Sequence, residues 1–345
     1  MIIIGFEGSA NKLGIGVVRG REILANLRET YVPPTGEGFK ITEAAAHHQK
    51  AIIGLFKRTL HESKIEMKDV SYLGYTAGPG IGLCLQIVAL FVKIVSETYG
   101  IPVVPVNHCV AHIEMGRFIT KAENPTILYV SGGNTQVITY RAGRYRIFGE
   151  TLDIAVGNLL DRLARELRIP NDPSPGYNIE QLAKKGKRYV ALPYSVKGMD
   201  VSFSGILSFL TRYIEEKGEI SEEVKADLCY SVQETVFAML VEVSERAMAC
   251  TGSSEILVVG GVGCNKRLQE MAASMAEQRG GRGFSADERY CVDNGLMIAH
   301  TAWKMVSSGY AAFATRCEVS QRYRTDSVEA TWREFEIEEA EREKI

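Results

Sequence analysis

Two histidines four residues apart, His108 and His112, are the first candidates for chemistry in this sequence. On an α-helix this spacing places both imidazoles on one face, where they could share a metal ion. Cys109 follows the first histidine, so the glutamate that acts as general base in an HExxH zinc peptidase is missing. A half-buried histidine pair without a metal would have the same spacing. A metal site needs further ligands, and the candidates Tyr129 and Asp293 are too distant in sequence for spacing to show that they converge.

Two glycine-containing turns between predicted strands are the second candidates, at Gly5–Asn11 and Ser131–Thr135. Because glycine has no Cβ, backbone N–H groups in such turns can approach phosphate oxygens. Each turn alone could be a simple hairpin connection, but their matching positions in the two halves favour phosphate binding. The chain has no GxxxxGK[ST] sequence, which argues against a P-loop nucleotide-binding protein.

Three other segments carry polar groups suited to a nucleotide or a small polar substrate. Gly260–Asn265 lies between a predicted strand and a predicted helix, where bare backbone leaves room for a flat base or a ribose. Asn265 could cap that helix or bind a hydroxyl group. Asp161 and the oxygen-rich segment Asn171–Glu180 could bind a ribose, or they could form a structural loop with Asx turns.

Composition narrows the class of protein. The 345 residues suffice for one large or two medium domains, and the net charge of −2 gives no global basic field for nucleic acid. Any RNA contact would need a partner or a local patch, for which Lys184–Arg188 is a candidate. Seven cysteines without a CxxC pair indicate a reducing compartment, and no signal peptide or membrane span is expected.

The apolar pattern predicts an α/β chain whose opening repeats. A strand–glycine turn–strand unit begins each half, which argues for two related α/β lobes facing each other. We expect lobes at residues 1–122 and 123–333, with the final helix able to pack back on the first lobe, and an acidic tail at 334–345. Thr42 is the expected N-cap of the first helix. Strands are predicted at 2–4, 13–18, 70–76, 103–106, 126–130, 136–140 and 255–259, and helices at 42–62, 83–98, 154–168, 222–250, 266–279 and 294–307.

Seven segments together carry a resemblance to one known family: Gly5–Asn11, His47-His48, Val106–Gly116, Leu128–Gln136, Asp172–Glu180, Lys197–Gly205 and Gly260–Asn265. Over residues 2–333 the sequence resembles the TsaD/KEOPS tRNA N6-adenosine threonylcarbamoyltransferase family, once misnamed O-sialoglycoprotein endopeptidase, and is most similar to its archaeal and eukaryotic branch. The resemblance implies a two-lobed actin/Hsp70/sugar-kinase-like (ASKHA) fold, with duplicated RNase H-like lobes around a central cleft.

The resemblance also implies a reaction and a site. The chain would transfer a threonylcarbamoyl group from threonylcarbamoyl-AMP to N6 of adenosine 37 in tRNAs that read ANN codons, as the catalytic subunit of the KEOPS complex. His108, His112 and Asp293 would be catalytic and, with Tyr129, would bind one divalent ion per subunit, either iron, zinc or magnesium. The adenylate, or an ATP- or AMP-type nucleotide, would be bound by Tyr129, Val130, Ser131, Gly132, Gly133, Asp161, Gly176, Glu180 and Asn265.

The implied partners are tRNA, a small kinase-like subunit and a dimerising subunit. The implied location is the cytoplasm and nucleus, without a membrane.

Three alternative functions follow from the residues, because an actin-like fold does not fix function. A sugar- or acetate-kinase-type phosphotransferase would share the phosphate loops without needing the histidine pair. A metallopeptidase is disfavoured by Cys109, and a non-catalytic scaffold by the presence of every candidate ligand.

Overall fold

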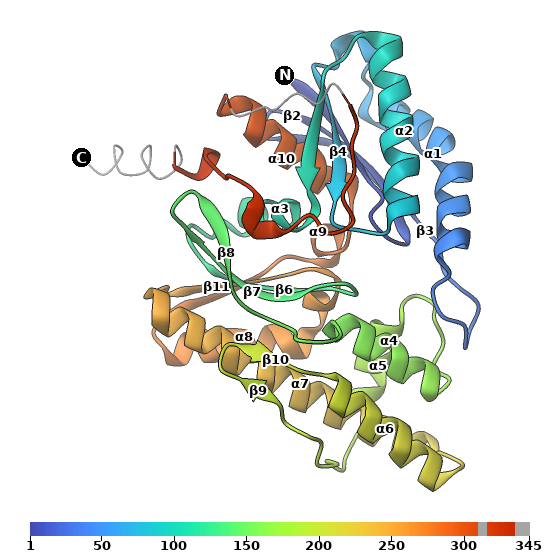
Figure 1. The fold of residues 1–345 in the computed structure, drawn as a ribbon, viewed down its shortest axis with the longest axis vertical. Coiled ribbons are helices and arrows are strands. Elements are labelled where there is room, and N and C mark those ends of the chain that lie inside the picture. The colour runs from blue at the N-terminus through green and yellow to red at the C-terminus, as the bar shows by residue number, and fades with distance from the viewer. Residues whose placement is uncertain (310–315, 335–345) are drawn as a thin grey trace.

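The computed structural model describes residues 1–309 and 316–334, and it contains two five-stranded mixed sheets (Figure 1). The predicted acidic tail therefore lies outside the described residues except for Glu334. The first sheet has the strand order β3-β2-β1-β4-β5. Its strands are β1 (Ile2–Glu7), β2 (Lys12–Arg19), β3 (Glu22–Thr30), β4 (Tyr72–Gly78) and β5 (Val103–Asn107).

The second sheet repeats this layout, with the order β12-β11-β6-β7-β8. In both sheets the first three strands form an antiparallel meander, and two parallel strands extend the sheet beyond the first strand. The common topology explains the repeated sequence pattern. The strands are β6 (Thr126–Val130), β7 (Thr135–Arg141), β8 (Arg144–Glu150), β11 (Glu255–Val259) and β12 (Arg282–Ser285).

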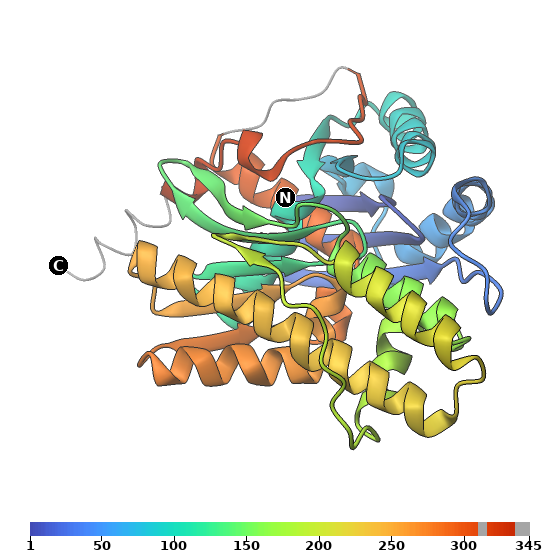
Figure 2. The ribbon, with the colours of Figure 1, turned by 60° about the horizontal axis from the view of Figure 1, so that its bottom comes forward.

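Helices cover both outer faces and fill the space between the sheets (Figure 2). The first sheet carries α1 (Ile41–Ser63) and α2 (Gly82–Tyr99), and the second carries α7 (Glu222–Thr251) and α8 (Lys266–Gln278). Two helices, α3 (His108–Thr120) and α10 (Gly295–Ser307), lie between the sheets. The short helix α9 (Glu288–Cys291) precedes α10 in the chain. The remaining elements flank the second sheet: α4 (Val156–Glu166), α5 (Pro175–Ala183), α6 (Ser204–Lys217) and the hairpin of β9 (Val196–Lys197) and β10 (Asp200–Val201).

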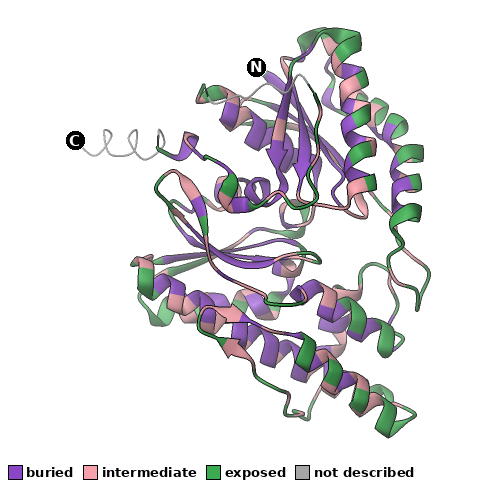
Figure 3. Ribbon diagram, viewed as in Figure 1, coloured by how far each residue is buried: buried purple, intermediate pink, exposed green. Residues whose placement is uncertain are grey.

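The backbone of α10 packs directly against the backbone of the first sheet, and this close packing depends on glycine. A Cβ at Gly5 would lie 2.2 Å from the backbone nitrogen of Ala299, and one at Gly295 would lie 2.3 Å from that of Gly16. Side chains at these positions would push the helix off the sheet. The helix closes a buried core that joins both sheets, seen as the purple centre of Figure 3. We refer below to the first sheet with α1, α2 and α10 as the first lobe, and to the second sheet with α4–α8 as the second lobe.

Several elements differ from the sequence predictions. The first helix begins at Ile41 after Lys40, so the assignment of Thr42 as its N-cap was wrong. The elements β3, β8, β12 and α6 were not predicted from the sequence, although the apolar residues of α6 recur at helical spacing. The segment Asn171–Glu180, interpreted as a loop, contains the start of α5. Among the described helices only α2 is long and apolar enough to cross a membrane, and 33% of its 18-residue window is buried. Its inner face packs on β4 and α1, as in a core helix.

Candidate metal centre and adjoining loops

The histidine pair lies at the first turn of α3, between the two sheets. Asn107 ends β5 and caps the helix, because its Oδ1 accepts a hydrogen bond of 3.1 Å from the backbone N–H of Val110. The helix therefore starts at His108, and His112 follows one turn later with its ring centroid 4.7 Å away. Both side chains are almost fully buried. The predicted shared face is confirmed.

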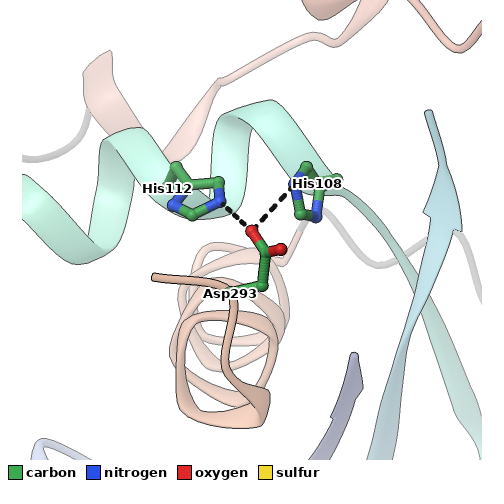
Figure 4. Close-up of side chains that lie close together, drawn as sticks. All are labelled: His108, His112 and Asp293. Atoms are coloured by element: carbon green, nitrogen blue, oxygen red, sulfur yellow. Dashed lines mark hydrogen bonds and ion pairs between the residues drawn. The ribbon is translucent and has the colours of Figure 1, made fainter. Parts of the chain in front are cut away.

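Asp293 completes a three-residue cluster with these histidines (Figure 4). It lies in the connection between α9 and α10, which is fixed because Asn294 accepts a hydrogen bond of 2.9 Å from the Met297 N–H and caps α10. Its Oδ1 lies 3.0 Å from Nε2 of His112 and 3.5 Å from Nε2 of His108. One potential ligand atom from each residue lies within 4.8 Å of the others.

Tyr129, the fourth predicted ligand, lies beside this cluster near the end of β6. Its ring centroid is 5.4 Å from that of His112. Within the described residues, its buried hydroxyl has no hydrogen-bond partner. A buried hydroxyl is costly when unpaired, so this oxygen is available to a ligand bound at the cluster. Imidazole nitrogens with carboxylate and phenol oxygens fit a divalent transition metal better than magnesium, which prefers oxygen ligands.

Glu7 orients His108, and sequence reasoning had not singled it out. This fully buried carboxylate accepts hydrogen bonds from Nδ1 of His108 at 3.1 Å and from the Ser9 N–H at 2.7 Å, and a third from the hydroxyl of Thr76. A proton held at Nδ1 leaves Nε2 of His108 free to act as a metal ligand. The sequence did contain a signal for this role, because Glu7 is an acidic residue at the end of an otherwise apolar strand.

Charge is balanced within the cluster. Burial would raise the pKa of Asp293, but nearby Lys12, His112 and His108 hold it well below its usual range. Nζ of Lys12 lies 3.5 Å from the Asp293 carboxylate, a second contact that the sequence did not reveal. Burial lowers the pKa of His112 despite its hydrogen bond to Asp293, so His112 is neutral, as metal ligation requires. Burial also lowers the pKa of His108, but Glu7 outweighs this effect and raises it.

The glycines of the Ser131–Thr135 turn are not required by packing. A Cβ at Gly132 or Gly133 would meet no atom within 4 Å, and neither residue has a positive φ. Gly176 at the start of α5 is equally open. These positions therefore leave backbone accessible to a ligand, as the phosphate-binding prediction requires. Gly260 differs, because its φ of +94° and a Cβ distance of 2.3 Å to the Val130 oxygen make glycine a structural necessity.

The remaining predicted binding residues lie on second-lobe elements. Asp161, on α4, stays open to solvent, yet burial by surrounding protein raises its pKa to about 6 against the opposing effect of Lys12 and Arg165. The buried Glu180 accepts a hydrogen bond of 3.2 Å from the Lys266 N–H. Val130 and Ser131 lie next to Tyr129 at the end of β6 and in the turn after it.

Asn265 acts within the protein as the N-cap of α8. Its Oδ1 accepts hydrogen bonds from the N–H groups of Arg267 at 2.9 Å and Leu268 at 3.3 Å. Its Nδ2 donates to Oε1 of Gln233 at 2.8 Å. Of the two roles that the sequence left open, the structure therefore supports capping, and both polar atoms of the side chain are engaged.

Comparisons with known proteins agree closely with one another. A family model described as TsaD, tRNA N6-adenosine threonylcarbamoyltransferase, matches residues 22–300. The chain is 59% identical to the tRNA N6-adenosine threonylcarbamoyltransferase of Encephalitozoon cuniculi over 335 residues, which are 97% of this chain and 100% of that protein. It is 58% identical to the Homo sapiens protein of the same name, over 96% of this chain and 99% of that protein.

Solved structures with similar folds are much more distant in sequence. HypF of T. kodakarensis matches with a TM-score of 0.63 and 14% identity, over 90% of this chain and 48% of that one. Component A of the Acidaminococcus fermentans (R)-2-hydroxyglutaryl-CoA dehydratase matches with a TM-score of 0.55 and 15% identity, over 89% and 99%. These similarities concern the fold alone, and they confirm the predicted two-lobed actin-like class.

Proposed function

The chain belongs to the family of tRNA N6-adenosine threonylcarbamoyltransferases and has that transferase activity, and from this premise we propose which residues perform it. The proposed metal ligands are His108, His112, Asp293 and Tyr129. The proposed donor is threonylcarbamoyl-AMP and the proposed acceptor is N6 of adenosine 37 in tRNAs that read ANN codons. A transferase activity leaves the phosphotransferase, peptidase and scaffold alternatives without support.

The observation that carries the metal proposal is the convergence of His108, His112 and Asp293 within 4.8 Å in a buried setting. A divalent cation bound there would supply Lewis acidity toward a carbonyl or phosphoryl oxygen. The chain's own groups prepare the ligands, because Glu7 fixes the proton on His108 and the low pKa of Asp293 keeps its carboxylate charged. The two imidazole nitrogens in the ligand set favour iron or zinc over magnesium.

The adenylate would lie beside this centre, against the second-lobe glycine turn. The N–H groups at Gly132 and Gly133 can approach phosphate oxygens and stabilise charge that develops on the leaving AMP. The adenine N6 is a weak nucleophile, because its lone pair is delocalised into the ring, so catalysis rests largely on positioning. Asp161, Gly176, Glu180 and Asn265 are proposed to shape the remainder of the nucleotide site. A single-stranded tRNA loop lowers the energy needed to turn the adenine outward.

Substitution of His108 by alanine tests the metal centre. The variant is expected to lose both metal retention and threonylcarbamoyl transfer, measured by elemental analysis and by mass spectrometry of tRNA nucleosides after reconstitution with candidate partner subunits. Normal modification by the His108→Ala variant would contradict this proposal. Because His108 is buried and hydrogen-bonds to the buried Glu7 carboxylate, the variant should lose stability, and circular dichroism must show that it still folds.

A protein partner is supported by an exposed apolar stripe on α2. Leu83, Leu90 and Ile94 are 46%, 59% and 53% exposed and recur at intervals of one or two helical turns, so they share one face. Ile53 on the neighbouring α1 is 55% exposed. Exposed apolar side chains that share a helix face can mark an interaction site, and the dimerising KEOPS subunit is the proposed occupant. A small kinase-like subunit near the catalytic site, and a cytoplasmic and nuclear location, are proposed from the family resemblance.

A further inference from the structure

The side chain of Asn171 bridges the two lobes. Asn171 lies in the second-lobe connection between α4 and α5, and its Nδ2 is 2.7 Å from the carbonyl oxygen of Pro34. The same nitrogen lies 3.2 Å from the oxygen of Pro33 and 3.3 Å from that of Glu37. All three carbonyls belong to the first-lobe loop 31–40, which descends beside α4 and α5 in Figure 1. Two amide hydrogens thus serve three acceptors from the opposite lobe.

A second asparagine holds Asn171 in place. Nδ2 of Asn178, on α5, donates to the carbonyl oxygens of Pro170 at 2.8 Å and Asp172 at 2.9 Å. These two residues flank Asn171 in the chain, so the hydrogen bonds fix the backbone on both sides of it. The Asn171 amide is therefore presented from a supported loop rather than from a freely moving one.

The two lobes also meet tightly one step along the loop. A Cβ at Gly38 would lie 2.5 Å from Nη2 of Arg165, so the guanidinium of this second-lobe arginine lies directly against the backbone of the first-lobe loop. Arg165 follows Asp161 by one helical turn on α4, and residues four apart share a face. The helix face that carries Asp161 therefore also carries the contact with the first-lobe loop.

The loop begins beside the residue that precedes Lys12. The Tyr31 N–H donates to the Asn11 oxygen at 2.8 Å, and Nδ2 of Asn11 donates to the Tyr31 oxygen at 3.1 Å. Asn11 is followed by Lys12, whose Nζ lies 3.5 Å from Asp293. The loop thus starts from a strand with one side chain that reaches the metal cluster, and it contacts the connection between the helices that carry Asp161 and Glu180. Its contacts with Asn171 are exposed and neutral, which suits a bond that opens and closes.

We propose that Asn171 is a positioning residue that latches the lobes together, and that this latch governs how long the adenylate and AMP stay in the site. The inference rests on the proposed function of Asp161, Glu180 and the glycine turn as the adenylate site. With the latch closed, loop 31–40 restricts the nucleotide side of the lobe junction. With the latch open, loop 31–40 and the α4–α5 connection separate, so nucleotide exchanges more freely.

Two substitutions at Asn171 test the latch by different means. Asn171→Ala removes the donor, and Asn171→Asp keeps the size but places carboxylate oxygens against three carbonyl oxygens. The control is Thr35→Ala, which alters an exposed side chain in the same loop that makes no hydrogen bond within the described residues. Hydrogen exchange of the full chain, followed by mass spectrometry with and without AMP, reports on opening without requiring catalysis.

In Asn171→Ala we expect hydrogen exchange to be about fivefold faster in peptides from loop 31–40 and from the α4–α5 connection. The increase should be larger in Asn171→Asp. Hydrogen exchange in α1 and α3 should stay unchanged in both variants. In the reconstituted enzyme, KM for threonylcarbamoyl-AMP should rise by about the same factor without loss of kcat or metal content. Thr35→Ala should match the wild type in both measurements. Unchanged exchange of loop 31–40 in both Asn171 variants would overturn the latch. Faster exchange with an unchanged KM would overturn the control of nucleotide by the latch, whereas the adenylate site itself is tested separately by Gly132→Ala.

Discussion

Replacement of Glu7 by glutamine should weaken metal binding without unfolding the protein. The carboxylate accepts hydrogen bonds from His108, Ser9 and Thr76, whereas a glutamine side chain has a single acceptor oxygen. If the new NH2 group faces His108, Nδ1 must accept a hydrogen bond and the imidazole proton moves to Nε2, the atom that faces Asp293. If it faces Ser9 instead, two N–H donors confront each other. Both arrangements disfavour the ligand geometry.

The expected size of this effect follows from two independent estimates. Loss of a group that orients a metal ligand typically weakens metal affinity by about 10- to 100-fold, or about 1.4 to 2.7 kcal/mol. Loss of one hydrogen bond to a charged group is worth about 1.5 to 3 kcal/mol. The estimates overlap, so we expect metal affinity to fall by about one to two orders of magnitude.

Competition between the protein and a chelator of known affinity measures this change directly, and the thermal midpoint of the metal-free protein shows whether the fold persists. Glu255→Gln provides the control, because Glu255 is another buried carboxylate that pairs with Arg282 at the far end of β11. That variant should lose some stability but no metal affinity. Metal binding by Glu7→Gln as tight as in the wild type would refute the role of Glu7 in orienting His108.

Three further outcomes are expected. Asp161→Asn should raise the thermal midpoint by a small amount at pH 8 and leave it unchanged at pH 4. The carboxyl pKa is raised to about 6 in the folded protein, so the ionised form is destabilised as pH rises from about 4 through 6, and the exposure of the side chain to solvent keeps this cost small. An equal midpoint at pH 8 would contradict the raised pKa. Gly132→Ala should leave stability unchanged, because its Cβ would meet no atom within 4 Å, but it should raise KM for threonylcarbamoyl-AMP. Gly260→Ala should instead lower stability, because its Cβ would lie 2.3 Å from the Val130 oxygen. Unfolding curves measure the effect on stability, and kinetics measure the effect on KM. With a net charge of −2, the isolated chain should bind tRNA weakly. Filter binding should show a steep loss of tRNA affinity between about 50 and 200 mM salt. Tight and salt-independent binding would argue against a need for partner subunits.

The local features of the site could be predicted from the sequence, because each is set by residues close together in the chain. The four-residue spacing of His108 and His112 fixes a shared helix face, and the turn that begins at Ser131 follows from turn chemistry between apolar strands. The predicted turn Gly5–Asn11 was wrong in its first part, because β1 continues to Glu7 and Gly5 packs within the sheet against α10. The repeated strand–turn–strand opening indicated two related lobes, because a sheet topology that is used twice leaves the same hydrophobic pattern twice.

Other features depended on contacts between residues far apart in the chain. Asp293 reaches His112 across 181 residues only because α10 seats on the first sheet, where Gly5 permits close approach to Ala299. The roles of Glu7 and Lys12 in holding the cluster, and the choice of capping for Asn265, likewise required three-dimensional packing.

Sequence alone thus determined the types of group available and the short segments that present them. The tertiary structure decided which groups meet, such as Asn171 and the first-lobe loop 31–40. The physical reason is that helix periods and turns are stabilised over a few residues, whereas convergence depends on how whole elements pack and on the few positions, such as Gly5, where a single Cβ would prevent that packing.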